Sequence, residues 1–354
     1  MSVSARPHLL LVFGGRSSEH EVSIRSATSV LEAIDRQRFT PSLLVIRRDG
    51  QFVAAPEDTP LGEVERRGAP VGDLRALAPD LVFPVLHGPF GEDGTFQGLL
   101  EVLDLPYVGA GVLASALCMD KAVCKRFLQS LEPPVPVTPW VECDAHELAD
   151  PATREALLAR VGERLGYPCF VKPANQGSSV GVSKVTGPDA LLAALALAAR
   201  YDPKIVIERG IDCREIELAV LGDGGPETAV SEPGEIGLPP GVWYDYATKY
   251  EDDVASLQIP ADLPEETSRT LQALALQAFR ATGCQGLARI DFLVDRATLT
   301  PYLNELNTMP GFTSISMYPK LMAHAGVSFR ALVTRLCELA LARHAARRHL
   351  AITR

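Results

Sequence analysis

The sequence of 354 residues predicts an α/β protein whose C-terminal part is α+β, and three observations lead to this prediction. Short apolar runs that end in glycine, such as residues 8–13, alternate early in the chain with segments of helical periodicity. From about residue 167, strand-like segments follow one another with fewer helices between them. The overall composition, 47% hydrophobic and 22% charged, is ordinary for a soluble globular protein.

The first part of the chain predicts a parallel sheet. Residues 8–13 read as a buried strand that ends at Gly14-Gly15. The helix after this turn has one apolar face, formed by Ile24, Ala27, Val30, Leu31 and Ile34. Further strands are expected at residues 41–47, 80–86 and 105–108. Alternation of strands and helices favours parallel strands with helices on the faces of the sheet.

A proline cluster at residues 133–139 separates this region from the rest. Beyond it we expect strands at residues 167–172, 204–208, 214–221, 287–294 and 302–306. Helices are expected at residues 189–199 and 265–282 and in the C-terminal segment that begins near Phe329. The period-2 and period-3.6 patterns together indicate the α+β part of the fold.

Charge and cysteine content exclude several classes. The chain has 34 basic and 44 acidic side chains, a net charge of −10, which argues against non-specific nucleic-acid binding. The longest apolar stretch, residues 190–199, is about half of a membrane span, and no signal peptide is recognisable. Seven scattered cysteines without a CxxC motif argue against a disulfide framework or structural zinc. We therefore expect a cytoplasmic protein with no nucleic-acid or membrane partner.

Two segments near the C-terminus, ARIDF and NELN, predict a metal site. Residues i and i+2 of a strand point to the same face, so Arg289 and Asp291 share a face, as do Glu305 and Asn307. In a hairpin that turns near Pro301, Asp291 lies opposite Glu305 and Arg289 opposite Asn307. Two carboxylates and an amide oxygen suit Mg²⁺ that also binds substrate phosphates. The alternative is a surface cluster of salt bridges.

A glycine–serine loop follows the strand that ends near Lys172, in the run FVKPANQGSSVG. Small residues allow backbone N–H groups to approach phosphate oxygens, and hydroxyl groups add donors. The run lacks the GK[ST] of a Walker A loop, and a flexible surface turn is the alternative. Together with the carboxylates, the loop favours a nucleoside triphosphate as ligand.

Three other motifs are ambiguous from local pattern alone. In GGRSSEHEVS, Ser18 and Glu21 have the spacing of a capping box, and the same helix start could bind an anion. VGAGVLA fits a dinucleotide fingerprint but comes too late in the chain to serve as one. In HGPFGEDG, His87 is accompanied by no nucleophile motif, so a structural donor is the simpler interpretation. Residues 243–250 read as a loop or lid.

Taken together, these segments resemble the D-alanine–D-alanine ligases of the ATP-grasp superfamily. The matching segments run from Gly14 to Ser316 in the order GGRSSEHEVS, HGPFGEDG, MDK, KPANQGSSVGVSKV, IVIERGIDCREIE, YDYATKY, ARIDF and NELNTMPGFTSIS. The resemblance implies a three-domain ATP-grasp architecture with an N-terminal parallel-sheet domain. The expected boundaries are 1–115, 116–209 and 210–354.

The resemblance also implies the reaction and its cofactors. One D-alanine carboxylate attacks the γ-phosphate of ATP to give D-alanyl phosphate, and the amino group of a second D-alanine displaces phosphate. The product would serve peptidoglycan precursor synthesis. Two Mg²⁺ or Mn²⁺ ions are expected, K⁺ is a further candidate ion, and a homodimer is the expected assembly. Alternatives are a D-alanine–D-lactate or D-alanine–D-serine ligase, another ATP-grasp carboxylate–amine ligase, or a non-catalytic nucleotide-binding protein.

By resemblance, the ATP site would include residues from several segments. The phosphates would contact Lys121, Lys172, Ser178, Ser179 and Lys249. Glu208 would bind the adenine amino group and Glu215 the ribose. The metal ions would be held by Asp291, Glu305 and Asn307, in agreement with the hairpin argument.

The substrate residues follow from the same resemblance. Glu21 would hold the ammonium group of the first D-alanine, with Ser178 and Tyr250 as its hydrogen-bonded partners. Arg289 and the Gly311 N–H would stabilise the oxyanion. His87 and Ser316 would lie at the second substrate, and Tyr244 would be a further substrate contact. Tyr250 favours D-alanine over D-lactate as the second substrate.

Overall fold

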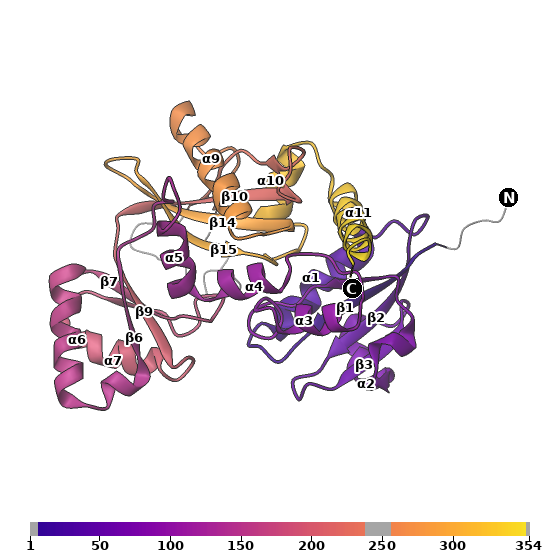
Figure 1. Cartoon of the computed structure of the whole chain (residues 1–354), viewed down its shortest axis with the longest axis horizontal. Coiled ribbons are helices and arrows are strands. Elements are labelled where there is room, and N and C mark those ends of the chain that lie inside the picture. Colours follow the sequence, from indigo (N-terminus) through magenta and orange to yellow (C-terminus); the bar gives the residue numbers. More distant parts are fainter. Residues whose placement is uncertain (1–5, 238–255, 352–354) are drawn as a thin grey trace.

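The computed structural model describes residues 6–237 and 256–351, which form three β-sheets with helices packed against them (Figure 1). Each sheet is built from a different stretch of the chain, and the N-terminal, central and C-terminal sheets follow in chain order. None of the helices in the described ranges is both long and apolar enough to cross a bilayer. The seven cysteines all carry unbridged thiols.

The N-terminal sheet has the strand order β4-β3-β2-β1-β5. Its strands are β1 (His8–Gly14), β2 (Thr40–Ile46), β3 (Phe52–Pro56), β4 (Ala69–Val71) and β5 (Leu81–Pro84). The parallel prediction is confirmed for β2-β1-β5, whereas β3 and β4 add an antiparallel edge. The strand expected at residues 105–108 is wrong, because Tyr107 makes only a single bridge to Val82. The helices are α1 (His20–Ala33), α2 (Val64–Arg67) and α3 (Thr95–Val102).

The central sheet is antiparallel in the order β6-β9-β7-β8. Its strands are β6 (Trp140–Asp144), β7 (Cys169–Pro173), β8 (Ser183–Val185) and β9 (Lys204–Arg209). Helices α6 (Pro151–Arg164) and α7 (Pro188–Ala198) pack on it through a shared apolar core. The opposite side of β7 and β9 carries Lys172 and Glu208, which face the functional cavity described below.

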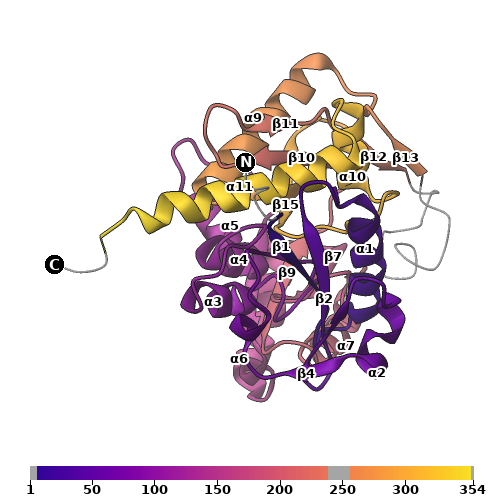
Figure 2. The ribbon, with the colours of Figure 1, turned by 90° about the vertical axis from the view of Figure 1, so that its right-hand side faces the viewer.

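The C-terminal sheet has the order β13-β12-β10-β14-β15, with β11 paired to β10. Its strands are β10 (Cys213–Gly222), β11 (Ala229–Val230), β12 (Gly234–Gly237), β13 (Ser256–Gln258), β14 (Gly286–Asp295) and β15 (Pro301–Asn307). Helices α9 (Glu265–Ala281), α10 (Met317–His324) and α11 (Phe329–Arg348) complete this region. Figure 2 shows α11 running between the C-terminal and N-terminal sheets, and its apolar residues share one core with β1 and β5.

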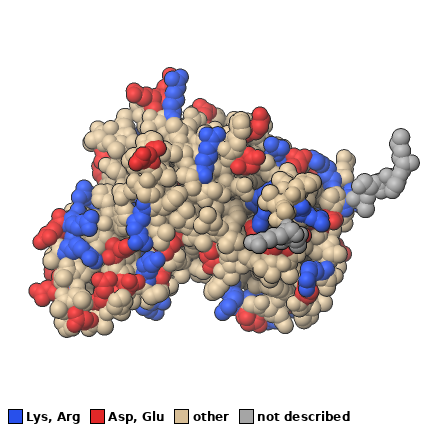
Figure 3. Space-filling model, viewed as in Figure 1, with Lys and Arg blue, Asp and Glu red and all other residues tan. Residues whose placement is uncertain are grey.

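Two helices join the sheets: α4 (Val112–Met119) and α5 (Lys121–Gln129). Both bury apolar side chains against the C-terminal sheet, including Ala114 and Leu128. The expected boundary between residues 115 and 116 therefore falls inside α4, whereas the one after residue 209 falls at the end of β9. Over the face in Figure 3, acidic and basic side chains are interspersed without a broad basic stripe.

Candidate active site

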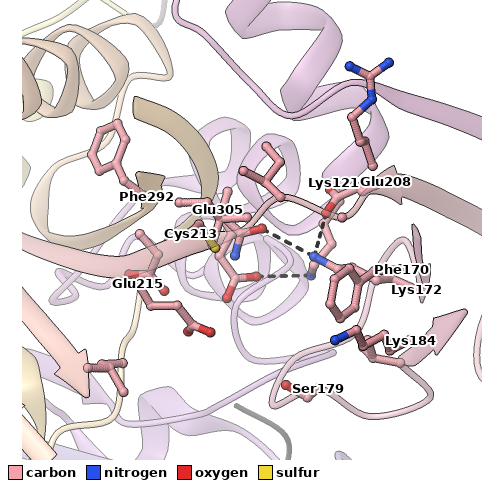
Figure 4. Close-up of a pocket in the computed structure, with 18 of the residues that line it drawn as sticks. Lys121, Phe170, Lys172, Ser179, Lys184, Glu208, Cys213, Glu215, Phe292 and Glu305 are labelled. Atoms are coloured by element: carbon pink, nitrogen blue, oxygen red, sulfur yellow. Dashed lines mark hydrogen bonds and ion pairs between the residues drawn. The ribbon is translucent and has the colours of Figure 1, made fainter. Parts of the chain in front are cut away.

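A cavity of about 760 Å³ lies between the central sheet and the C-terminal sheet (Figure 4). Strands β7, β8 and β9 line one wall, and β10, β14 and β15 line the other. Residues from segments far apart in the sequence meet here as the sequence predicts. The expected residues that line the cavity are Lys121, Lys172, Ser178, Ser179, Glu208, Glu215, Asp291 and Glu305.

Glu208 is a buried carboxylate held by two cations at one end of the cavity. The Nζ of Lys172 lies 2.6 Å from its Oε2, and the Nζ of Lys125 lies 2.8 Å from its Oε1. Burial alone would raise the pKa of Glu208, but the two ammonium groups outweigh burial and hold this pKa at about 2. Glu208 therefore presents an ionised hydrogen-bond acceptor at neutral pH.

The hairpin β14–β15 has the register that the sequence predicts. Asp291 pairs with Glu305 and Arg289 with Asn307. The guanidinium of Arg289 donates to both carboxylate oxygens of Asp291 at 2.7 Å, and Asn307 Nδ2 donates to Asp291 Oδ2 at 3.0 Å. A bulge after Asp291 in the strand pairing leaves this constellation intact.

Arg289 also contacts Glu217 on β10, a residue for which the sequence analysis gave no role. Its Nε lies 3.0 Å from Glu217 Oε2. Burial would lower the pKa of the Arg289 guanidinium, yet Asp291 and Glu217 together hold it well above its ordinary value. The guanidinium is thus a permanent, oriented cation beside the expected metal ligands. The i, i+2 spacing of Glu215 and Glu217 on one strand was the signal that could have found Glu217.

Lys121 connects the glycine–serine loop to the hairpin. It is the first residue of α5, after the N-cap Asp120, whose side chain accepts from the N–H groups of Ala122 and Val123. Its Nζ donates to the Gln176 carbonyl at 2.7 Å and lies 3.4 Å from Glu305 Oε2. Lys121 therefore stands between the expected phosphate loop and an expected metal ligand.

The donor set of the hairpin fits a divalent cation that shares its coordination with phosphate. Asp291 and Glu305 line the cavity with carboxylate groups, and Asn307, whose Nδ2 donates to Asp291, is the amide residue beside them. Within the described ranges, no group of three or more His, Cys, Asp or Glu side chains is placed to hold a metal ion by itself. Two carboxylates and one amide match Mg²⁺, which is usually bound by few protein ligands plus phosphates.

The expected contact between Glu21 and Ser178 is wrong, because the structure places Glu19 beside Ser178 instead. Helix α1 begins after Glu19, and its N-cap has no side-chain hydrogen bond, so the capping box between Ser18 and Glu21 is absent. The Glu21 side chain is 70% exposed and pairs with Arg48 at 3.2 Å. The residue that accepts a hydrogen bond from the Ser178 hydroxyl is Glu19.

Close packing surrounds Glu19. It is buried, and a Cβ placed on Gly177 or Gly88 would lie 2.7 or 2.5 Å from its Oε2. The two glycines therefore permit the carboxylate to sit between the glycine–serine loop and the loop after β5. Ser178 and Ser179 both have positive φ, 48° and 58°, which shows how tightly this loop turns.

His87 positions the loop that contains Gly311. Its Nδ1 lies 3.0 Å from the Met309 carbonyl, which only accepts, so this nitrogen donates. Its Nε2 lies 2.9 Å from Ser26 Oγ, which also accepts from the Phe312 N–H at 3.3 Å. Burial lowers the pKa of His87, in keeping with a neutral ring that accepts from Ser26. His87 therefore acts through hydrogen bonds to the loop on both sides of Gly311.

Glu92, which is half-buried, is a second link to the same loop and has no role assigned from sequence. Its Oε1 accepts from the Met309 N–H at 3.1 Å and its Oε2 from the Gly88 N–H at 2.7 Å. Burial, reinforced by Glu19, raises the pKa of Glu92 to about 8. Its place in the run HGPFGEDG was the only sequence signal.

The remaining expected residues divide into two groups. Gly311 and Ser316 are neighbours, because a Cβ on Gly311 would lie 3.3 Å from Ser316 Oγ. Ser316, the N-cap of α10, has its Oγ 2.8 Å from Thr313 Oγ1. The other group, Tyr244, Lys249 and Tyr250, lies outside the described residues.

Comparisons with known proteins identify the family of this chain. Residues 8–110 match the family described as D-ala D-ala ligase N-terminus, and residues 131–338 match D-ala D-ala ligase C-terminus. A D-alanine–D-alanine ligase of Thermoanaerobacter sp. (strain X514) is 46% identical over 95% of this chain and 97% of its own length. One of Solibacter usitatus is 45% identical over 94% and 95%.

Two solved structures are also similar along the whole chain. The D-alanine–D-alanine ligase of Coxiella burnetii superposes with a TM-score of 0.82 at 33% identity, covering 97% of this chain and 96% of that one. The VanG D-Ala:D-Ser ligase of Enterococcus faecalis gives 0.83 at 33% identity, covering 95% and 99%. With its two family matches, its relatives and its ATP-grasp fold, this chain belongs to the D-alanine–D-alanine ligase family.

Proposed function

We propose that this protein is an ATP-dependent ligase that joins two molecules of D-alanine through a D-alanyl phosphate intermediate. The observation that carries the proposal is one cavity lined by two lysines, the glycine–serine loop and the hairpin β14–β15 with its expected metal ligands. This arrangement supplies positive charge and oxygen ligands around a triphosphate, which is what phosphoryl transfer requires. The family relationship supports D-alanine as substrate.

ATP would lie between the central and C-terminal sheets. Lys121 and Lys172 line the cavity where phosphates would bind, next to the hydroxyls of Ser178 and Ser179. Glu208 offers an ionised acceptor for the adenine amino group, and Glu215 would accept from the ribose. Lys249 would approach the transferred phosphate. A triphosphate in this position would direct its γ-phosphate toward the hairpin.

Asp291, Glu305 and Asn307 would hold two Mg²⁺ or Mn²⁺ ions, and K⁺ remains a proposed further ion. When bound, the divalent ions neutralise charge on the phosphates during transfer. The chain's own residues orient these ligands. Arg289 fixes Asp291 through two hydrogen bonds, and Lys121 lies beside Glu305.

The first D-alanine would place its ammonium group on Glu19, the buried carboxylate that Ser178 already contacts. Its carboxylate would then attack the γ-phosphate, forming D-alanyl phosphate and ADP. Arg289 and the Gly311 N–H would stabilise the oxyanion when the amino group of the second D-alanine attacks. Phosphate leaves as the peptide bond forms. His87 would keep the Gly311 loop in place through Ser26 and Met309.

Ser316, beside Gly311, would bind the carboxylate of the second D-alanine. Tyr244 and Tyr250 are proposed as further substrate contacts. The dipeptide would serve peptidoglycan precursor synthesis in the cytoplasm.

We also propose a homodimer. Val102 of α3 and Leu113 of α4 are 85% and 75% exposed and lie on helices that are in contact. Such exposed apolar side chains favour a contact with another protein chain.

A phosphate-release assay tests the proposal. The purified chain with ATP, Mg²⁺ and D-alanine should release phosphate and form D-alanyl-D-alanine in equal amounts. Release that requires D-serine or D-lactate as second substrate would refute the choice of D-alanine. ATP binding without turnover on any of these substrates would refute the ligase activity itself.

Light scattering of the wild type and of Leu113→Asp tests the proposed dimer. The wild type should have the mass of a dimer, and the variant that of a monomer.

A further inference from the structure

Lys125 is a buried cation behind the cavity and has no role in the proposed reaction. It belongs to α5, and its side chain is 1% exposed. Its Nζ donates to Thr138 Oγ1 at 2.7 Å and lies 2.8 Å from Glu208 Oε1. Glu208 lines the cavity, whereas Lys125 does not. Lys125 can therefore act on a ligand through Glu208, with which it forms an ion pair.

The two lysines that hold Glu208 differ in what they can do next. Lys172 lines the cavity, and its Nζ also donates to Asn304 Oδ1 at 3.3 Å. A nucleotide phosphate in the cavity would compete with Glu208 for the Lys172 ammonium. Lys125 is enclosed between Glu208 and Thr138 and has no access to that phosphate. The ion pair between Lys125 and Glu208 would therefore persist when Lys172 binds a phosphate of the nucleotide.

A counter-ion is necessary because Glu208 is itself buried. A carboxylate in an enclosed site without a cation takes up a proton to avoid the cost of a buried charge. The groups that face the Glu208–Lys172 pair are Lys125 from α5, Glu215 from β10 and Glu305 from β15. Of these, only Lys125 is a cation, and it therefore compensates the charge of Glu208 after Lys172 has moved.

Resting on the proposed placement of adenine at Glu208, we infer that Lys125 is a positioning residue that sets nucleotide selectivity. It keeps Glu208 an acceptor for a 6-amino group while Lys172 serves the phosphates. An ionised carboxylate only accepts hydrogen bonds, so it favours a 6-amino purine and disfavours a 6-oxo purine. A protonated Glu208 could donate to the 6-oxo group of inosine triphosphate, and the preference would weaken.

The test is Lys125→Met, assayed with ATP and with inosine triphosphate. The KM for ATP should rise about tenfold, the value of one charge-assisted hydrogen bond, with a smaller fall in kcat. The ratio of kcat/KM for inosine triphosphate to that for ATP should rise by about tenfold as well. An unchanged ratio in a variant whose thermal unfolding matches wild type would overturn the inference.

Two further variants keep the test decisive. Thr138→Val leaves the ion pair to Glu208 and should keep the wild-type ratio, and a shift equal to that of Lys125→Met would overturn the inference in favour of packing. If Lys125→Met does not fold, Lys125→Gln keeps a donor without charge and should shift the ratio in the same direction. A wild-type ratio in that variant would also overturn the inference.

Glu208→Gln separates this inference from the proposed function. It should change the ratio, because the amide both donates and accepts. If Glu208→Gln leaves the ratio unchanged, the placement of adenine is wrong. If Glu208→Gln changes it and the Lys125 variants do not, only the role of Lys125 is wrong.

Discussion

The hairpin β14–β15 and the turn from β1 into α1 both contribute to the site, but the sequence predicts them unequally. In the hairpin, Asp291 faces Glu305 as the period-2 pattern requires. At the turn, the expected residue Glu21 points to solvent, and Glu19 occupies the site. Strand register follows from local periodicity, whereas the start of a helix after a glycine turn depends on distant contacts. Here those contacts come from Ser178 and Gly177.

The largest expected effect tests the hairpin. Asp291→Asn should lower kcat/KM at least about 100-fold, because it removes a charged metal ligand at the transferred phosphate. Steady-state phosphate release measures this. Glu227→Gln, at an exposed carboxylate that does not line the cavity, is the matched control and should behave as wild type. Full activity in Asp291→Asn would break the metal assignment.

The next effect sharpens the comparison itself. Glu19→Gln should raise the KM for the first D-alanine about ten- to 100-fold, because a charge-assisted hydrogen bond to the ammonium is lost. Glu21→Gln, two residues along, should leave this KM within about twofold, since its exposed side chain pairs with exposed Arg48. The reverse pattern would restore the interpretation that the sequence alone suggested.

A smaller effect is expected from the hydrogen bonds that reach the Gly311 loop from the N-terminal sheet. Ser26→Ala removes the hydroxyl between His87 and the Phe312 N–H. We expect kcat to fall about fivefold, the value of roughly 1 kcal/mol, while the KM for ATP stays constant. A change in the KM for ATP with constant kcat would contradict a role at the oxyanion.

The last effect concerns the pH dependence of stability rather than turnover. The pKa of Glu92 is raised from an ordinary 4.5 to about 8, so the folded protein binds more protons than the unfolded chain in between. The contribution of Glu92 to the free energy of unfolding is therefore present below pH 4.5 and is lost as pH rises toward 8. The Tm of wild type minus that of Glu92→Gln should therefore fall between pH 5 and 8. A constant difference would show that Glu92 does not titrate in this range.

How much the sequence reveals depends on the range of the interaction. The strands β7, β9, β14 and β15 could be predicted because buried strands leave an alternating or continuous apolar pattern. Glu92 and Lys125 could not be assigned roles, because their partners, Met309 and Glu208, are far away in the sequence. The strand prediction at residues 105–108 was wrong for a related reason. An apolar run does not show whether a neighbouring strand is available to pair with it, and here only Tyr107 forms a bridge, to Val82.

The central claim is that both regions meet to phosphorylate the carboxylate of D-alanine, and isotope transfer tests it most directly. D-alanine labelled with ¹⁸O in both carboxylate oxygens is incubated with the enzyme, ATP and Mg²⁺, and the released phosphate is analysed by mass spectrometry. If D-alanyl phosphate forms, each phosphate carries one ¹⁸O from the first D-alanine. Phosphate without ¹⁸O would contradict the account, because its oxygen would then come from water.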